Sequence, residues 1–205
     1  MTPVEKRRAE DCYFFSSFLV EKLLQNGLLA EAVPGDNDDA VEWNQKFQKN
    51  IDGVKKWTEH INIFLKKFIY VPVHIAQHWS LIVVCNPGNI GLMNPDADAD
   101  EEIPAFVCMD SLKIHPLEKI CKILRKYLNG EWNRCSITPL RITARNFPAV
   151  FPEVPVQENL IDCGVFLLKY AAWFFDACIE GRPILLTRKS VEEKLKGVVD
   201  NDMFR

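Results

Sequence analysis

The segment Gln157–Gly164 and the apolar run after it constrain this chain more than any other part. Polar residues lead up to Cys163 and Gly164, and neither glycine nor proline interrupts the residues from Val165 to Phe175. The pattern predicts a helix that begins near Cys163. At a helix start, unpaired backbone N–H groups and the positive end of the helix dipole favour a cysteine thiolate over its thiol. The thiolate is the nucleophilic form, so Cys163 is our first candidate for a catalytic residue.

The predicted helix is apolar on more than one face, which favours a largely buried position in the fold. The apolar residues that fill these faces are Val165, Phe166, Leu168, Ala172, Trp173 and Phe175. Free cysteine is often a small buried core residue, and Cys163 has that alternative role. The polar approach to the helix and the partners described below favour the catalytic role.

Length and composition fit one globular domain, residues 1–205. With 205 residues and 48% hydrophobic content the chain can bury a sizeable core. A formal net charge of −3 gives no basic footprint, so we do not expect nucleic acid as a partner. The seven cysteines include no C-x-x-C pair, which argues against zinc ribbons and thioredoxin-like sites. Free thiols point to a reducing compartment, the nucleus or the cytoplasm.

The N-terminus imitates a signal peptide, with basic residues at 6–8 and an apolar run at 12–20. Glu10 and Asp11 interrupt the join between these two parts, and Glu21 follows the apolar run directly. These flanks favour a folded helix over a signal sequence. No apolar run in the sequence is long enough to cross a membrane, so we expect no membrane partner.

Two helical regions are predicted before the first strand. Asp11 is the expected N-cap of a helix that ends near Gly27 and carries apolar residues at helical spacing. Residues 41–61 form a second helical region, in which Gly53 is a candidate break.

Three strands follow these helices. Residues 68–76 are rich in β-branched and aromatic residues, but Pro72 indicates a sheet edge or a strand start. In residues 78–85, alternation predicts that even-numbered side chains share one face and odd-numbered ones the other. Residues 105–109 form a short apolar strand that brings Asp110 to its end.

The remaining elements are predicted from periodicity and turn signals. Residues 117–128 have the pattern of an amphipathic helix, which Asn129 and Gly130 are expected to stop. A short strand is expected at 136–142, and one further helix at 190–199.

Two patterns resemble metal sites but lack essential ligands. In the acidic loop 89–104, a D-x-D-x-D start resembles a calcium loop, yet Glu101 replaces the required glycine and Val107 the bidentate glutamate. His74 and His78 form an H-x-x-x-H pair without the glutamate of zinc proteases, on a predicted strand. We therefore predict no metal site, and a solvated acidic loop.

A cysteine nucleophile needs a base, a group that orients the base and a donor to the developing oxyanion. His78 opens a buried strand, so its ring can project from a sheet end as the base. Asp110 closes the next strand and can hold the imidazole tautomer. Gln157 offers a side-chain amide to the oxyanion, and the backbone N–H of Cys163 is a second donor. Each has an alternative role, as a structural histidine, a turn aspartate or a solvated glutamine.

Three separated motifs together resemble the ubiquitin-like-protein-specific cysteine proteases that process and remove SUMO, the sentrin-specific proteases. The motifs are His78-Trp79-Ser80-Leu-Ile-Val-Val, Met109-Asp110-Ser111-Leu and Gln157-x-Asn159-x-x-Asp162-Cys163-Gly164. They occur in the family's order, histidine then aspartate then cysteine. The resemblance covers residues 10–178.

This resemblance implies an α+β fold of the papain-like class, with a central mixed sheet flanked by helices. It implies that Cys163 is the nucleophile, His78 the general base and later the acid, Asp110 its orienter and Gln157 the oxyanion donor. Trp79 is expected over the narrow channel for the Gly-Gly tail of the modifier, with core packing as its alternative. The implied partner is SUMO or a related ubiquitin-like modifier and its conjugates, and the chemistry requires no cofactor.

The spacing from His78 to Asp110 is long for the family because it contains the acidic loop. In this respect the chain resembles the branch of the family that edits poly-SUMO chains. Family domains ordinarily begin earlier, with a segment that supplies another tryptophan to the tail channel. We therefore expect weak or no activity from residues 1–205 alone. Two alternatives stay open: a SUMO-binding module without catalysis, and a protease for another ubiquitin-like modifier.

Overall fold

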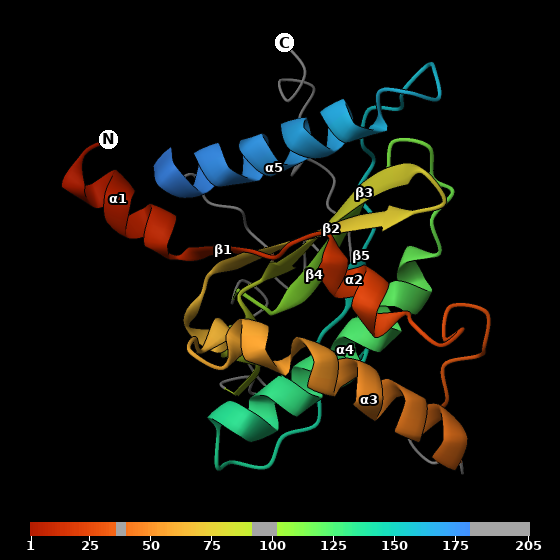
Figure 1. Ribbon diagram of the computed structural model, residues 1–205. Coiled ribbons are helices and arrows are strands. Elements are labelled where there is room, and N and C mark those ends of the chain that lie inside the picture. The colour runs from red at the N-terminus through yellow and green to blue at the C-terminus, as the bar shows by residue number, and fades with distance from the viewer. Residues whose placement is uncertain (36–39, 92–101, 181–205) are drawn as a thin grey trace.

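The computed structural model describes residues 1–35, 40–91 and 102–180 (Figure 1). Its centre is a five-stranded mixed sheet with the strand order β1-β2-β3-β4-β5. β1 runs parallel to β2 and β5 runs parallel to β4, whereas β2, β3 and β4 are antiparallel neighbours. The strands are β1 (Cys12–Phe14), β2 (Phe68–Ile75), β3 (His78–Cys85), β4 (Ala105–Met109) and β5 (Ala149–Val150).

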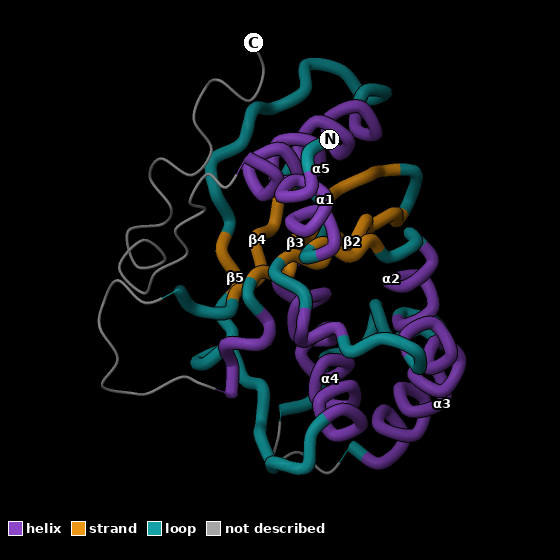
Figure 2. The backbone as a smooth tube through the Cα atoms, turned by 90° about the vertical axis from the view of Figure 1, so that its left-hand side faces the viewer, coloured by secondary structure: helices purple, strands orange, loops and turns teal. Residues whose placement is uncertain are grey.

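Helices cover both faces of this sheet, so the predicted α+β fold is confirmed (Figure 2). One face carries α5 (Cys163–Glu180), and α1 (Pro3–Glu10) packs beside the end of α5 (Figure 1). The opposite face carries α2 (Phe18–Leu23), α3 (Val41–Thr58) and α4 (Leu117–Cys135). Two short 3-10 helices, η1 (Ile63–Leu65) and η2 (Pro87–Gly91), complete the elements described.

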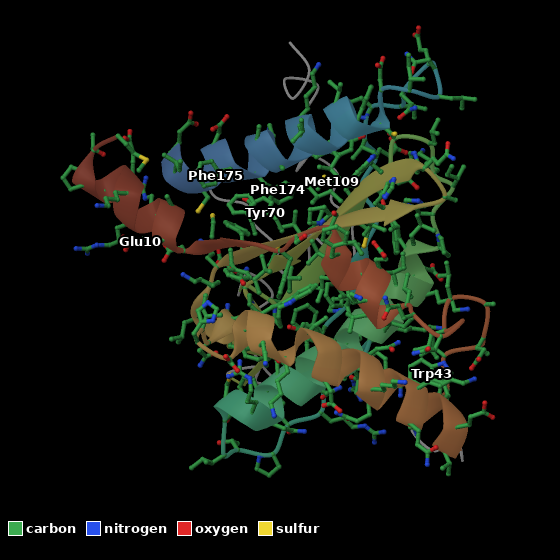
Figure 3. The ribbon with its side chains drawn as sticks, viewed as in Figure 1. Glu10, Trp43, Tyr70, Met109, Phe174 and Phe175 are labelled. Atoms are coloured by element: carbon green, nitrogen blue, oxygen red, sulfur yellow. The ribbon has the colours of Figure 1, made fainter. Side chains whose placement is uncertain are left out.

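Strand alternation divides the core into two clusters, one on each face of the sheet. In β3, even-numbered apolar residues such as Ile82 join the cluster beneath α2, α3 and α4. Odd-numbered residues such as Leu81 join the cluster beneath α5. Tyr70, Met109 and Phe174 fill the space between α5 and the sheet (Figure 3). The alternation predicted for β3 is therefore confirmed, and burial on both faces explains the nearly continuous apolar sequence of β2 to β4.

Pro72 lies inside β2, but at a point where the sheet has an open edge. The Phe68 N–H and the Tyr70 C=O point toward β1, so the nitrogen of Pro72, which lies two residues beyond Tyr70, faces the same side. β1 pairs only with residues 68–70, and no β1 residue lies opposite Pro72. The missing N–H therefore costs no ladder bond, and the prediction of a sheet edge is confirmed locally.

The predicted helix from Asp11 to Gly27 is wrong. Asp11 is the C-cap of α1, and the chain then forms β1 before the short helix α2 begins at Phe18. The cause is pairing with a distant strand: β1 aligns with residues 68–70, and the Phe14 ring stacks on Tyr70 with the centroids 4.3 Å apart. Helical spacing of apolar residues is a local signal, and tertiary pairing outweighs it here.

Gly53 does not divide the second helical region. α3 runs unbroken from Val41 to Thr58 because one face buries Trp43, Phe47 and Val54. A Cβ added at Gly53 meets nothing within 4 Å, so the position lies on the open side of the helix.

Asn129 and Gly130 do not stop α4, which continues to Cys135. The Asn129 side chain donates to the Ile142 C=O at 3.1 Å and accepts from the Ile142 N–H at 2.8 Å, so it fastens the following segment to the helix. The Trp132 ring packs edge-on against Phe64, with the centroids 4.9 Å apart. These contacts stabilise the helical turns of α4 that follow Leu128. The strand predicted at 136–142 is also wrong, since β5 lies at 149–150.

α5 begins at Cys163 as predicted, but it is not buried all round. Its buried face is formed by Cys163, Leu167, Tyr170, Phe174, Ala177 and Cys178, at helical spacing. Val165 and Leu168 are 51% and 67% exposed, because the sheet covers the helix from one side only.

Two predicted features lie outside the described residues: most of the acidic loop, at 92–101, and the helix at 190–199. Within the described ranges, no helix has both the length and the apolar character needed to cross a membrane.

Candidate active site

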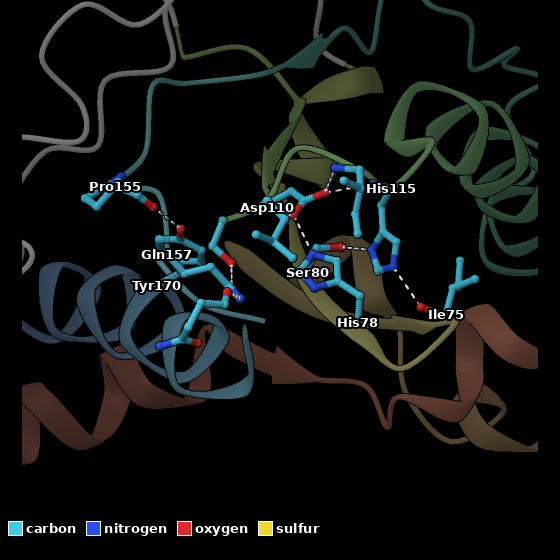
Figure 4. A network of polar contacts seen from close by, with 12 residues as sticks. Ile75, His78, Ser80, Asp110, His115, Pro155, Gln157 and Tyr170 are labelled. Atoms are coloured by element: carbon cyan, nitrogen blue, oxygen red, sulfur yellow. Dashed lines mark hydrogen bonds and ion pairs between the residues drawn. The ribbon is translucent and has the colours of Figure 1, made fainter. Parts of the chain in front are cut away.

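The structure brings His78 and Asp110 together at one end of the sheet, where β3 begins and β4 ends (Figure 4). The antiparallel register pairs Leu81 with Met109, so the start of β3 lies beside the end of β4. Nε2 of His78 is 2.6 Å from Oδ1 of Asp110, and both side chains are buried. This contact joins the residue expected to act as the base with the residue expected to orient it.

The Asp110 carboxylate is held by the turn that follows β4. Oδ1 accepts the Leu112 N–H at 3.0 Å, and Oδ2 accepts the N–H groups of Ile114 and His115 at 3.0 and 2.9 Å. Burial by itself raises the pKa of this carboxyl, but the hydrogen bonds from His115, His78 and Leu112 outweigh burial and lower the pKa. The carboxylate therefore accepts from Nε2–H of His78, and Nδ1 is the ring nitrogen that remains for a thiol.

Cys163 lies in the first turn of α5. The C=O of Asp162 accepts the Phe166 N–H at 3.0 Å, which is the first bond of the helix, and the Cys163 side chain is buried. A Cβ added at Gly164 lies 3.9 Å from Cδ1 of Trp79. Because Trp79 is the residue after His78, this close approach brings the start of α5 against the start of β3.

The structure records no hydrogen bond between the Cys163 thiol and the His78 ring, both of which belong to the described residues. Bonds between a nucleophile and its base are commonly loose before substrate binds. The assignment of the two residues as nucleophile and base stays a prediction.

Gln157 is buried, and its side chain is oriented at both ends. Oε1 accepts the Ser111 hydroxyl at 2.6 Å, and Nε2 donates to the Asn159 C=O at 2.5 Å. The Gln157 N–H also donates to the Ser111 C=O at 3.2 Å. An amide nitrogen carries two hydrogens, so one remains for an oxyanion. Tyr170 of α5 supports the same segment through its hydroxyl, which donates to the Pro155 C=O at 3.0 Å (Figure 4).

Trp79 is half-buried between the core and the surface. Its ring stacks on the exposed His74 ring with the centroids 4.2 Å apart, and it packs against the cluster beneath α5. The register places His74 opposite Trp79 and Ile75 opposite His78, so the two histidines of H-x-x-x-H lie on different faces of the hairpin. Part of the Trp79 side chain therefore packs on the core, which is its alternative role. Its role in covering the tail channel stays a prediction.

Sequence reasoning missed three residues that support these side chains. Ser111 orients Gln157, although it was noted only as part of a motif. Ser80 and His115 bond to each other at 2.7 Å, beside His78. The available signal for Ser80 was alternation, because it shares a strand face with His78. The motif that contains Ser111 gives no indication of its bond to Gln157, and nothing in the local sequence distinguishes His115.

His78, Asp110 and His115 are close enough to be compared with a metal site, since each offers a ligand atom within 4.8 Å of the others. The donor set does not fit a metal ion. Each oxygen of Asp110 already accepts two hydrogen bonds, and both ring nitrogens of His115 have protein partners. Binding an ion would break this network, so we assign the cluster to hydrogen bonding.

The chain was compared with known proteins. Residues 1–197 match the Ulp1 protease family, C-terminal catalytic domain. Among curated relatives, a probable ubiquitin-like-specific protease 2A of Arabidopsis thaliana is 31% identical over 193 residues, which is 93% of this chain and 23% of the relative. A probable ubiquitin-like-specific protease 2B of the same plant is 35% identical over 167 residues, 79% of this chain and 16% of the relative.

Among solved structures, the crystal structure of a de-sumoylating protease superposes with a TM-score of 0.61 at 19% identity, and the match covers 94% of this chain and 70% of that one. At this identity the likeness concerns the fold, which agrees with the papain-like class predicted. The chain spans less than a quarter of the length of the two curated relatives named above. Since the family match extends over nearly all of the sequence, the chain belongs to the Ulp1 protease family and corresponds to its C-terminal catalytic domain.

Proposed function

We propose that this chain is a cysteine protease that cleaves after the Gly-Gly tail of a SUMO-like modifier, as an isopeptidase or an endopeptidase. The observation that carries the proposal is the buried His78–Asp110 pair, with Nε2 and Oδ1 2.6 Å apart, at the end of the sheet beside which α5 begins with Cys163. The names of the relatives, ubiquitin-like-specific proteases, support the substrate class.

The proposed reaction begins when His78 takes the thiol proton and Cys163 Sγ attacks the carbonyl carbon of the terminal glycine. The oxyanion accepts hydrogen bonds from Gln157 Nε2 and the Cys163 N–H. His78 then gives its proton to the departing lysine amine as the C–N bond breaks, which leaves a thioester. In the second half, water attacks the thioester carbonyl carbon while His78 takes one of its protons. The carbon–sulfur bond then breaks, His78 returns the proton to Cys163 Sγ, and the modifier leaves with a C-terminal carboxyl group. Asp110 keeps the His78 tautomer throughout.

We further propose that residues 1–205 belong to one catalytic domain, supported by the single sheet with one core cluster on each face. Trp79, half-buried beside Gly164, is proposed to cover the modifier tail. The nucleus or cytoplasm is the proposed location, since all seven cysteines are free thiols. Within the family we favour the chain-editing branch, on the long spacing between His78 and Asp110.

The test is incubation of the full chain with SUMO that carries an electrophilic C-terminus. We expect a covalent adduct, located at Cys163 by mass spectrometry, and no adduct with the Cys163→Ala variant. Cys135→Ser is the matched control, because Cys135 is the one free cysteine that is not fully buried and it lies at the far end of α4.

Reversible SUMO binding without an adduct contradicts the proposed catalysis and supports a binding module. An adduct with an electrophilic ubiquitin instead of SUMO contradicts the modifier assignment. Cleavage of a SUMO-linked peptide by Cys163→Ala at the parental rate shows that the nucleophile is another cysteine.

A further inference from the structure

His115 lies in the loop between β4 and α4, and both of its ring nitrogens have partners (Figure 4). Nε2 is 3.1 Å from the Ile75 C=O, and Nδ1 is 2.7 Å from the Ser80 hydroxyl. A carbonyl oxygen only accepts, so Nε2 carries the hydrogen and Nδ1 accepts from Ser80. The network therefore selects one tautomer of a neutral imidazole.

This ring packs directly on the proposed base. The centroids of His115 and His78 are 4.6 Å apart, with the ring planes at 62°. The His115 backbone N–H donates to Oδ2 of Asp110 at 2.9 Å, on the oxygen that His78 does not use. One residue thus touches both members of the His78–Asp110 pair.

His115 also holds the turn that leads into His78. The turn residues Ala76 and Gln77 have φ values of 50° and 63°, in the left-handed region that such residues rarely adopt. A two-residue hairpin turn of this kind usually contains asparagine or glycine. Non-glycine residues in this region cost about 1–3 kcal/mol each and persist where the surroundings impose them. The bond from His115 to the Ile75 C=O, directly before the turn, is one such restraint.

Burial lowers the pKa of the His115 ring, and the neighbouring His78 lowers it further. The Ile75 C=O acts in the opposite direction, as does the charge of Asp110. His74 of β2 also acts on His115 electrostatically. The other titratable groups that line the same two pockets as His115 come from β4, from its own loop, from α4 and from the segment after β5: Cys108, Lys113, Glu118, Lys119, Lys122 and Glu153. A neutral His115 avoids placing a second positive ring against His78 when His78 holds the thiol proton.

We propose that His115 is a positioning residue for the His78–Asp110 pair: its neutral ring braces the turn at Ala76 and Gln77 and supports the His78 imidazole without adding positive charge beside it. The inference rests on the proposed function, in which His78 carries a proton after the thiol has released it. His115 touches no reacting atom in this scheme.

Two substitutions at His115 separate shape from hydrogen bonding. His115→Phe keeps an aromatic ring against His78 and removes both nitrogens. His115→Gln keeps an N–H donor for the Ile75 C=O and does not titrate. We expect His115→Phe to lower kcat on a SUMO-linked substrate by about 10- to 100-fold, as the misplacement of a catalytic group does, with little change in KM. His115→Gln is expected to recover most of that loss.

A second readout needs no modifier. Alkylation of Cys163 by iodoacetamide, located by mass spectrometry, reports how readily the thiolate forms. We expect His115→Phe to slow it about tenfold near neutral pH. We expect the wild-type rate to fall more steeply on acidification than that of His115→Gln, because a protonated His115 places a second positive charge against His78. His60→Gln, which removes an exposed histidine far from the site, is the control and should match the wild type.

These measurements distinguish the two proposals. If the wild type neither cleaves a SUMO-linked substrate nor forms the adduct with electrophilic SUMO, but His115→Phe still slows alkylation, the proposed function is wrong and the positioning role stands. If folded His115→Phe keeps kcat and the alkylation rate within about twofold of wild type, the inference is wrong. A raised KM with unchanged kcat also overturns it, because His115 would then contact substrate. Where circular dichroism shows that His115→Phe is unfolded, His115→Gln decides: an acid limb as steep as that of the wild type contradicts the inference.

Discussion

At the scale of single residues, the geometry of the site depends on how Asp110 and Gln157 are held. Asp110 accepts hydrogen bonds on both carboxylate oxygens, three of them from the backbone of its own turn. The Gln157 side-chain amide accepts a hydrogen bond from the Ser111 hydroxyl and donates one to the Asn159 C=O. Each side chain therefore has one orientation before any substrate arrives, and this preorganisation is what electrostatic stabilisation requires.

Asp110→Asn tests the orienting role. The amide can keep a bond to His78, but its NH2 group also favours the wrong tautomer of the imidazole and faces N–H donors of the turn. We expect kcat to fall about 100-fold or more, by analogy with other triads. Asp176→Asn, on the exposed side of α5, is the control. A fall of less than about threefold in steady-state cleavage would mean that another group orients His78.

Gln157→Ala tests the oxyanion donor. Removal of one such donor typically costs about 10²–10³ in kcat. Ser111→Ala should give a smaller loss, because the donor remains and only its orientation loosens. Glu158→Ala, an exposed neighbour, controls for changes in the backbone. Separate measurement of kcat and KM decides the matter: a higher KM with an unchanged kcat makes Gln157 a substrate-binding residue.

At the scale of elements, two boundaries were decided by contacts between distant parts of the chain. β1 replaces the start of a predicted helix because residues 12–14 pair with residues 68–70. α4 passes through Asn129 and Gly130 because its last turns gain contacts to residues 64 and 142. By contrast, α5 begins where the local sequence predicts, because the stop of the polar segment and the start of the apolar run coincide at Cys163.

Asn129→Ala tests the explanation for α4. The substitution leaves the N–H and C=O of Ile142 without their partner, so we expect the free energy of unfolding to fall by about 1–3 kcal/mol. Asn133→Ala, one turn further along the same helix and exposed, should change it by less than about 0.5 kcal/mol. Equal losses in urea unfolding for the two variants would contradict the role of the Ile142 bonds.

At the scale of the whole molecule, the sheet separates two hydrophobic core clusters. The proposed active site lies at the end of the sheet where β3 begins and β4 ends. The cluster beneath α2, α3 and α4 fixes one face, and α5 packs on the other, so the helix that carries Cys163 and the strands that carry His78 and Asp110 share one rigid frame. Asp110 and His115 lie at this end of the sheet, and folding lowers the pKa of each, so their protonation is coupled to folding.

Stability is expected to fall on acidification. The pKa of His115 in the folded chain lies below its ordinary value of 6.5. At pH values between these two pKa values, His115 is protonated in the unfolded chain and neutral in the folded chain. The free energy of unfolding therefore decreases as the pH falls below about 6.5. The pKa of Asp110 is also lowered, from 3.8, so its contribution is present above that value and is lost as the pH falls through the folded value.

Urea unfolding at pH 7.5 and 5.5 measures this loss. His115→Gln should show a smaller loss between the two pH values than the wild type, and His60→Gln should show the same loss as the wild type. A loss that is identical in His115→Gln and the wild type means that other groups cause it.

The sequence by itself determined what depends on neighbours along the chain: the strands predicted at 68–76 and 78–85, which are β2 and β3, the alternation of β3, the helix start at Cys163 and the order of the three motifs. Tertiary structure alone decided β1, the length of α4 and the support that Ser111 and His115 give to the site. The physical reason is the range of the interactions. Periodicity and capping act over a few residues, whereas strand pairing and buried hydrogen bonds join residues that only the completed fold brings together.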